Sequence, residues 1–248
     1  MKHFITGLQF LTRISIAKET EWSPESFGRS VKFFPLIGGI LGIILLMMNQ
    51  LFAEYLPFLG FYMPPHVLPI LLIIANVILT GGLHCDGFMD TMDGIFSGRS
   101  KERMLEIMKD SRVGANGSMA FVLLIVLKWA LLMDLSPLVL PSALFVMPIL
   151  GRFAMVVGIT VFPYAKPDGI GKAFAQYADK YTLYIAATMT LLLIVLVGKQ
   201  AILSLGIVSL CTMLFARYAT KLVGGLTGDI YGALSELAEI IVLFVFLF

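Results

Sequence analysis

The sequence predicts an all-α fold, a polytopic bundle of membrane-spanning helices, and three observations support that prediction. Hydrophobic residues make up 58% of the 248 residues and charged residues only 14%, where a soluble domain carries roughly a quarter. The mean hydropathy is +0.92. The charged residues also gather between long uncharged runs, each close to the roughly 20 apolar residues that cross a bilayer as a helix.

Seven apolar runs are candidate spans. They cover residues 33–53, 66–83, 117–133, 138–161, 182–198, 200–219 and 235–248. The last run is short for a full crossing and would need a thin bilayer or the help of its neighbours. Before the first run, residues 4–16 have the pattern of a short amphipathic helix lying at the membrane surface. Neither a linker nor an internal repeat divides the chain, so residues 1–248 are expected to form one membrane domain.

Lysines and arginines concentrate on one side of these spans. Residues 1–32 and the loop 84–116 hold five each and the loop 162–181 holds three, whereas the alternate loops hold only Lys199. Because cytoplasmic loops are enriched in these residues, we expect the N-terminal segment 1–32 and every long loop to face the cytoplasm.

Composition also limits the partners. A net charge of +2 is too small to predict a nucleic-acid partner, so the lipid bilayer is the expected environment. The two cysteines, Cys85 and Cys211, have neither metal-ligand spacing nor a disulfide framework and are expected to be structural thiols. The final stretch "IIVLFVFLF" is expected to contact lipid or a second subunit, which leaves a homo-oligomer open.

The densest negative charge follows the second apolar run. In "GGLHCDGFMDTMDGIFSG", residues 81–98, Asp86, Asp90 and Asp93 are four and three residues apart, so in a helix they project from one face. Like charges at that spacing repel unless they share a cation, and carboxylate oxygens suit Mg²⁺ or Mn²⁺. A solvated acidic loop is the alternative, but acids in register beside an uncharged run favour a functional site. His84 is expected either to contact a phosphate or to be a satisfied core histidine.

The stretch "KERMLEIMKDSRVGANGSMA", residues 101–120, reads as an exposed helix followed by a glycine-rich turn. The turn leads directly into the next predicted helix, near Ser118. Backbone N–H groups at such a helix start, with Arg112 beside them, can hold a phosphate. The alternative is an ordinary loop and helix cap.

A second acidic helix is predicted in "KLVGGLTGDIYGALSELAEI", residues 221–240. Asp229, Glu236 and Glu239 are seven and three residues apart and share one helical face. If this helix faces the first, the acids form a site for one or two divalent ions, which would clamp the oxygens of a displacement at phosphorus. A cap at Asp229 and a polar groove are the alternative.

Two basic residues lie inside predicted spans. Arg152 needs a partner there, either an acid or a substrate phosphate. Lys128, next to Trp129, is expected to be a packing residue whose charged end snorkels to the surface. The loop containing Tyr164, Lys166 and Asp168 is expected to cover a site.

Three stretches resemble the signature segments of a known family. "GGLHCDGFMDTMDG", "EIMKDSRVGANG" and "GGLTGDIYGALSELAE" look like those of cobalamin synthase, the adenosylcobinamide-GDP ribazoletransferase family. "ITGLQFLTRISI" and "FFPLIGGILGIILL" are similar to its N-terminal pattern. The likeness runs from the N-terminus to about residue 240, in the order and spacing of the family.

The resemblance implies a Mg²⁺-dependent integral enzyme of the cell inner membrane. It would join adenosylcobinamide-GDP to α-ribazole, or to α-ribazole 5′-phosphate, and release GMP in the last assembly step of cobamide synthesis. The expected attack is by the α-ribazole 5′-hydroxyl on the phosphorus attached to the corrinoid side. Carboxylate-held Mg²⁺ would neutralise charge on the bridging and leaving oxygens.

The expected site roles combine the acids with these matching stretches. The predicted metal ligands are Asp86, Asp90, Asp93, Asp229 and Glu236. The candidates for taking the hydroxyl proton are Asp93 and Asp110. The predicted contacts to substrate phosphate are His84, Lys109, Arg112, Gly114 and Arg152. Thr227 and Glu239 are expected to hold the metal ligands in position without binding the ion themselves.

Three other classes of membrane protein share part of this pattern. A CDP-alcohol phosphotransferase is the nearest, because "DTMDGIFSGR" partly matches its D-x-x-D-G-x-x-A-R opening, although the arginine is displaced by one residue. A membrane prenyltransferase also uses two Asp-rich helices with Mg²⁺ and a diphosphate, but its acids usually follow an asparagine that is absent here. A transporter would bind an ion or solute at the acids, yet the chain shows no repeated halves. The sequence favours an enzyme.

Overall fold

The fold is known from a computed structural model, in which residues 2–17 and 22–248 are described. The remaining residues of the predicted N-terminal segment, including Lys18, lie outside the described residues. Within the described part of the chain the only β-pairing is a single bridge between Tyr164 and Leu226. The prediction of an all-α fold is therefore confirmed.

The helices follow one another along the chain in a simple order. They are α1 (Lys2–Leu11), α2 (Pro24–Ser30), the 3₁₀ turn η1 (Val31–Phe33), α3 (Phe34–Gln50), the π-turn η2 (Leu51–Tyr55), α4 (Leu56–Phe58), α5 (Val67–Thr80), α6 (Leu83–Phe96), α7 (Lys101–Ile107), α8 (Ala115–Asp134), α9 (Leu140–Val161), α10 (Ile170–Tyr177), α11 (Thr182–Ile194), α12 (Lys199–Val223) and α13 (Gly228–Val245).

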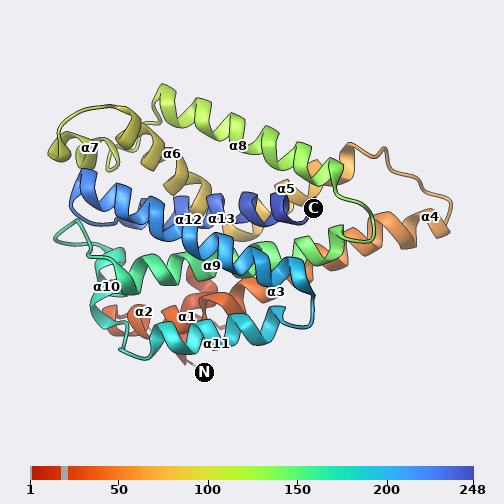
Figure 1. Ribbon diagram of the computed structural model, residues 1–248, viewed down its shortest axis with the longest axis horizontal. Coiled ribbons are helices and arrows are strands. Elements are labelled where there is room, and N and C mark those ends of the chain that lie inside the picture. The colour runs from red at the N-terminus through yellow and green to blue at the C-terminus, as the bar shows by residue number, and fades with distance from the viewer. Residues whose placement is uncertain (1, 18–21) are drawn as a thin grey trace.

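Two buried helices form the centre of the bundle. In Figure 1 the long helices run along the horizontal axis, and α9 packs against α3, α11, α12 and α13. Helix α13 in turn packs between α9 and α6. Most residues of α9 are buried and apolar. The helix is therefore covered on all sides, as an interior helix is.

Glycines explain how closely α3 approaches α9. A methyl group added at Gly42 would lie 3.0 Å from the Cα atom of Phe145, and one at Gly38 would lie 2.8 Å from the Cα atom of Ile149. Glycines four residues apart let two backbones touch, a common way for helices to associate in membranes.

Four segments are long and apolar enough to cross a membrane. They are residues Pro24–Phe58, which run from α2 through α3 to α4, and the helices α8, α9 and α12. A fifth is possible only if α5 and α6 count as one span, and these two helices meet at 92°. The chain is therefore a multi-pass membrane protein, but the predicted count of seven spans is not confirmed.

The differences from the predicted spans have local causes. The run 66–83 ends early because Gly81 and Gly82 both take positive φ angles, 64° and 72°, which stop α5 and turn the chain into α6. Helix α11 has only 13 residues, too few for a full crossing by itself. Helix α13 begins at residue 228, so it includes Asp229, which the predicted span 235–248 left outside.

The predicted surface helix 4–16 is shorter and better packed than expected. Helix α1 ends at Leu11, and one face of it, including Leu8 and Leu11, is buried. It packs against α2 and α3. The segment is therefore part of the bundle.

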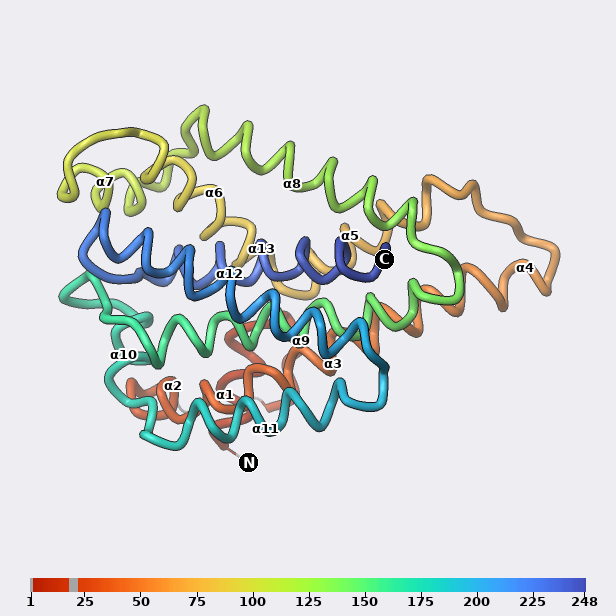
Figure 2. The backbone as a smooth tube through the Cα atoms, in the orientation of Figure 1, coloured from red at the N-terminus to blue at the C-terminus, as the bar shows by residue number. Residues whose placement is uncertain are grey.

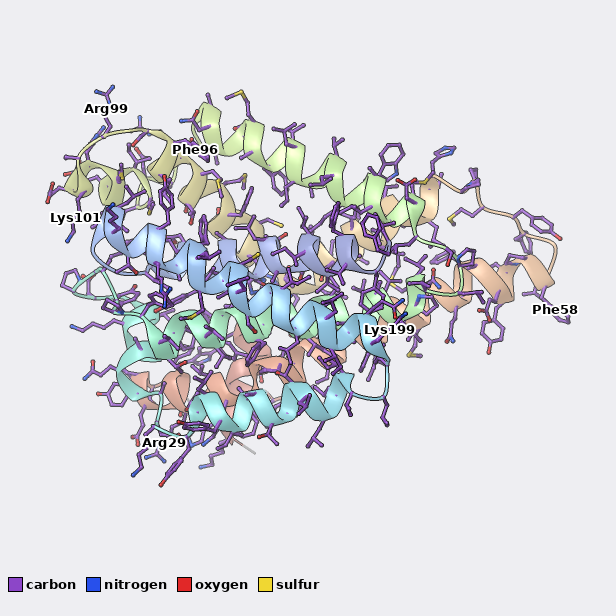
Figure 3. The ribbon with its side chains drawn as sticks, in the orientation of Figure 1. Arg29, Phe58, Phe96, Arg99, Lys101 and Lys199 are labelled. Carbon is purple, nitrogen blue, oxygen red and sulfur yellow. The ribbon has the colours of Figure 1, made fainter. Side chains whose placement is uncertain are left out.

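Basic residues mark one end of the molecule. Figure 3 shows Arg29, Arg99 and Lys101 toward the end that carries α7 and α10, with Phe58 and Lys199 toward the other. The tube in Figure 2 shows that the connections before and after α7, before and after α10, and before α13 all lie at the basic end. This agrees with the charge asymmetry read from the sequence.

Candidate functional site

Helices α6 and α13 cross in direct backbone contact at the basic end. A methyl group added at Gly87 would lie 2.7 Å from the carbonyl oxygen of Asp229, and one at Gly232 would lie 3.1 Å from the carbonyl oxygen of His84. Only glycine permits this approach. The crossing brings the acids of α6 beside Asp229, at the start of α13.

The aspartates at this crossing form one electrostatic group. Asp86 is exposed and Asp90 is half-buried. The Asp90 carboxylate faces like charges from Asp86, Asp229 and Asp93, with Lys166 as the opposing positive charge. In the part of the chain that the structure describes, no three His, Cys, Asp or Glu side chains lie close enough to hold one ion. The acids are thus coupled by charge without forming a closed coordination shell.

Asp229 is held by its neighbours on two sides. The Thr227 side chain caps α13 by accepting from the backbone N–H of Ile230 at 3.3 Å, and its hydroxyl donates to Asp229 Oδ2 at 3.1 Å. Lys166 Nζ donates to the same oxygen at 2.9 Å. Thr227 therefore contacts Asp229 directly, and its supporting role toward a metal ligand stays a prediction.

The loop between α9 and α10, which the sequence predicted to cover a site, is joined to the segment just before α13. The backbone N–H of Ala165 donates to the carbonyl of Leu226 at 2.8 Å, and that of Leu226 donates to the carbonyl of Pro163 at 2.7 Å. Burial, together with the negative charge of Asp229, raises the pKa of Tyr164 to about 12. The Tyr164 hydroxyl therefore stays protonated at neutral pH.

Asp93 has a different environment from the other aspartates. It is buried, and its two oxygens accept from the backbone N–H groups of Gly114 at 2.7 Å and Gly117 at 2.8 Å. These are donors at the start of α8, where the sequence predicted a bound phosphate. The carboxylate of Asp93 occupies them, so this helix start is capped from within the protein.

Asp110 and Arg112 form an exposed pair next to this turn. The Arg112 guanidinium donates to both oxygens of Asp110, at 3.1 and 2.8 Å, and these hydrogen bonds lower the pKa of Asp110 to about 2. A carboxylate with so low a pKa is a poor proton acceptor at neutral pH. Both residues line a surface hollow of about 770 Å³ together with Asp93, Arg99 and Arg103, and Lys109 is exposed nearby at the end of α7.

The remaining acids of α13 lie in a buried ion-pair network. Lys128 Nζ is 2.6 Å from Glu236 Oε2 and 2.6 Å from Glu239 Oε2, and Arg152 Nη1 is 2.6 Å from Glu239 Oε1. All four side chains are buried. Two positive and two negative charges cancel inside the bundle, as buried charges require.

This network changes three interpretations. Lys128 does not snorkel to the surface, because its ammonium group is needed as the shared partner of two carboxylates. Arg152 takes the acid partner that the sequence left open, in place of a substrate phosphate. Glu236 lies with Lys128 and accepts from Cys85 Sγ at 3.5 Å, so the structure does not bring it together with the aspartates of α6.

His84 contacts the buried ion-pair network and lies two residues before Asp86 in the sequence. Its Nδ1 is 3.5 Å from Arg152 Nη2, and since a guanidinium only donates, Nδ1 accepts and the ring proton lies on Nε2. That Nε2 atom is buried, and none of the residues described in the structure forms a hydrogen bond with it.

Two functional candidates were missed by sequence reasoning. Asn76 donates to Glu239 Oε2 at 3.0 Å inside the bundle, and its amide within an otherwise apolar run was the signal that marked it. Tyr231 is buried and lies between Asp229 and Glu236 in the sequence, and no group in the described part of the chain forms a hydrogen bond with its hydroxyl. No spacing rule points to this residue.

The fold and the site together define a multi-pass helical membrane protein with an acidic site at its basic end. The chain belongs to the cobalamin-5-phosphate synthase family, which its residues 3–247 match.

Named relatives cover almost the whole chain. An adenosylcobinamide-GDP ribazoletransferase of Desulfitobacterium hafniense is 40% identical over 98% of this chain and 95% of its own length. Proteins of the same name from Fusobacterium nucleatum and Desulforamulus reducens are 35% and 40% identical, over 100% and 98% of this chain and 97% and 93% of their own. No solved structure matches the chain.

Proposed function

We propose that this chain is an adenosylcobinamide-GDP ribazoletransferase that requires Mg²⁺ and works at the cytoplasmic face of the cell inner membrane. The reaction joins the corrinoid phosphate to α-ribazole or α-ribazole 5′-phosphate and releases GMP. A new bond forms between a ribose oxygen and the corrinoid-side phosphorus. The bond from that phosphorus to the bridging oxygen breaks, and GMP leaves with that oxygen.

The attacking hydroxyl differs from the one expected from the sequence. A family named for a cobalamin 5-phosphate product keeps a phosphate on the 5′-oxygen, and an oxygen that carries a phosphate has no proton to lose and no free valence to attack. We therefore assign the attack to a secondary hydroxyl of the ribose, for the nucleoside and the nucleotide alike. The proton of that hydroxyl passes to a carboxylate of the aspartate group.

The observation that supports this proposal most is the contact between α6 and α13. It gathers Asp86, Asp90 and Asp229, three carboxylates with Lys166 as the opposing charge, at the end of the bundle where basic residues accumulate. Mg²⁺ usually binds through one or two carboxylates together with water and substrate phosphates, so one or two of these aspartates would be enough to hold it. When bound, Mg²⁺ supplies charge neutralisation at the pyrophosphate oxygens.

The remaining predicted ligands take supporting roles in this proposal. Both oxygens of Asp93 hold the start of α8, so Asp93 positions α8 against α6. Glu236 is committed to Lys128 and fixes α13. Arg112, Arg99 and Arg103 surround the adjacent hollow, where guanidinium groups suit the phosphate of the GMP portion.

The experiment is a reaction with competing substrates. Detergent-purified protein is given adenosylcobinamide-GDP, α-ribazole and Mg²⁺, and the cobamide and GMP are measured by chromatography; parallel reactions hold a CDP-alcohol or a prenyl diphosphate with its acceptor. We expect cobamide and GMP in equal amounts and no consumption of the other donors. Consumption of a CDP-alcohol or prenyl diphosphate without formation of cobamide would rule the proposal out.

A further inference from the structure

A second cavity lies beside the aspartate group and is not used by the phosphate chemistry. It has a volume of about 240 Å³ and opens between α1, α6, α10 and α13. Its walls are mostly aromatic and apolar, with Phe10, Phe174, Tyr164 and Tyr231 among the lining residues. Pockets for drug-sized ligands measure roughly 300–1,000 Å³, so this cavity suits a small ring system and is far too small for a corrinoid.

Two of the residues that line the cavity, Tyr231 and His84, carry buried polar atoms without partners. Among the residues that the structure describes, nothing forms a hydrogen bond with the Tyr231 hydroxyl or with His84 Nε2, and both residues are 1% exposed. The contact of His84 Nδ1 with Arg152 leaves the ring proton on Nε2, so both atoms can donate. Buried donors are normally satisfied, and exceptions call for an explanation such as an absent ligand.

The position of the cavity connects it to the transfer site. Gly228 is exposed, lines the cavity and directly precedes Asp229 in the chain. A methyl group added at Gly228 would meet no atom within 4 Å, so no described side chain crowds the backbone at this point of the wall. Tyr164, on the loop whose Lys166 binds Asp229, forms another part of the wall.

We propose that this cavity binds the planar heteroaromatic base of the acceptor nucleoside, and that the Tyr231 hydroxyl donates a hydrogen bond to the free ring nitrogen of that base. The inference rests on the proposed function, since it concerns the acceptor of the same reaction. A flat bicyclic base gains stacking against the aromatic walls. The one unsubstituted ring nitrogen of the base accepts a hydrogen bond, and the Tyr231 hydroxyl is the unpaired donor. The ribose attached to the base extends past Gly228 to the aspartates.

The test compares two nucleosides and three proteins. One nucleoside is α-ribazole; the other is the same α-riboside with the free ring nitrogen replaced by C–H, which keeps the shape and removes the acceptor. The proteins are the full-length wild type, Tyr231→Phe, and Tyr164→Phe as a matched control. The Tyr164 hydroxyl lies in the same cavity but is already engaged by backbone N–H groups of Gly228 and Lys172.

Binding of each nucleoside is measured by calorimetry on detergent-purified protein without a corrinoid, together with the thermal midpoint of each variant. We expect the wild type to bind α-ribazole about threefold to tenfold more tightly than the C–H analogue, the effect of one hydrogen bond to a neutral partner. Tyr231→Phe should bind both equally, and Tyr164→Phe should keep the preference. Loss of an unsatisfied buried hydroxyl should leave the thermal midpoint of Tyr231→Phe unchanged or higher.

The outcomes separate this inference from the proposed function. If Tyr231→Phe still prefers α-ribazole to the same extent as the wild type, the cavity assignment is wrong even if the enzyme makes cobamide. If the preference vanishes as expected but no cobamide forms, the base site stands and the proposed reaction fails. Absence of any preference in the wild type also overturns the assignment.

Discussion

Lys166 Nζ lies 2.9 Å from Asp229 Oδ2, so a residue of the loop between α9 and α10 neutralises the first acid of α13. The two residues are 63 positions apart, and the loop is held in place by its pairing with Leu226. Because Asp229 also faces Asp90, the lysine neutralises negative charge that the proposed Mg²⁺ site would use. In that proposal, Lys166 competes with Mg²⁺ for the Asp229 carboxylate.

Removal of this lysine should change the need for Mg²⁺. In Lys166→Met the Asp229 oxygen is free, so the Mg²⁺ concentration for half-maximal GMP release should fall, by up to about fivefold for a partly exposed ion pair. A Mg²⁺ titration of initial rates measures this. Lys172→Met is the matched control, since Lys172 Nζ donates to the carbonyl of Pro167 and carries no carboxylate partner there. An equal shift in both variants would refute direct competition at Asp229.

Substitution of Asp93 should loosen the start of α8. Asp93→Asn loses one acceptor for the N–H groups of Gly114 and Gly117, which should lower the free energy of unfolding by about 1–2 kcal/mol. Thermal unfolding in detergent measures the loss. Ser118→Ala, which removes an exposed hydroxyl that donates to the carbonyl of Gly114, should change stability little. A fully stable Asp93→Asn protein without activity would instead place Asp93 at the reacting atoms.

The buried network predicts a compensation between two variants. Lys128→Met removes the cation that Glu236 and Glu239 share, which leaves Glu236 buried without that ion pair, and should cost about 3–5 kcal/mol of stability. Adding Glu236→Gln removes the excess negative charge and leaves Glu239 with Arg152, so the double variant should unfold at a higher temperature than Lys128→Met alone. A double variant whose loss is the sum of the two single losses would argue against coupling.

The charge asymmetry predicts which end of the bundle faces the cytoplasm. Ser100 starts α7 at the basic end, and Ser136 lies in the connection from α8 to α9 at the opposite end; both are exposed. In spheroplasts, a membrane-impermeant maleimide should label Ser136→Cys directly and Ser100→Cys only after lysis. The unsubstituted protein controls for Cys85 and Cys211. The reverse pattern would invert the proposed orientation.

Much of the architecture followed from the sequence. The apolar runs predicted the helices that became α3, α8, α9 and α12, because uncharged stretches near 20 residues have few alternatives in a membrane. The one-face register of Asp86 and Asp90 was also visible, since helical spacing is a local property.

Long-range partners were not predictable from spacing. Lys128 is 108 and 111 residues from its two glutamates, and only the packing of α8 on α13 shows that it turns inward. Asp93 shared its register with two neighbouring acids, yet its oxygens meet backbone donors more than 20 residues away. The break of the predicted span at Gly81 and Gly82 depends on φ angles that a glycine pair allows without requiring.

In the proposed reaction, the aspartates at the α6–α13 crossing perform a Mg²⁺-dependent phosphate transfer. A decisive experiment measures GMP release from adenosylcobinamide-GDP and α-ribazole by wild type, Asp90→Asn and the surface control Glu25→Gln, whose partner Arg29 is exposed on α2. We predict that the wild type and Glu25→Gln release GMP only with Mg²⁺, and that Asp90→Asn inserts and purifies normally but is slower by about a hundredfold or more. Normal turnover by Asp90→Asn would contradict the account.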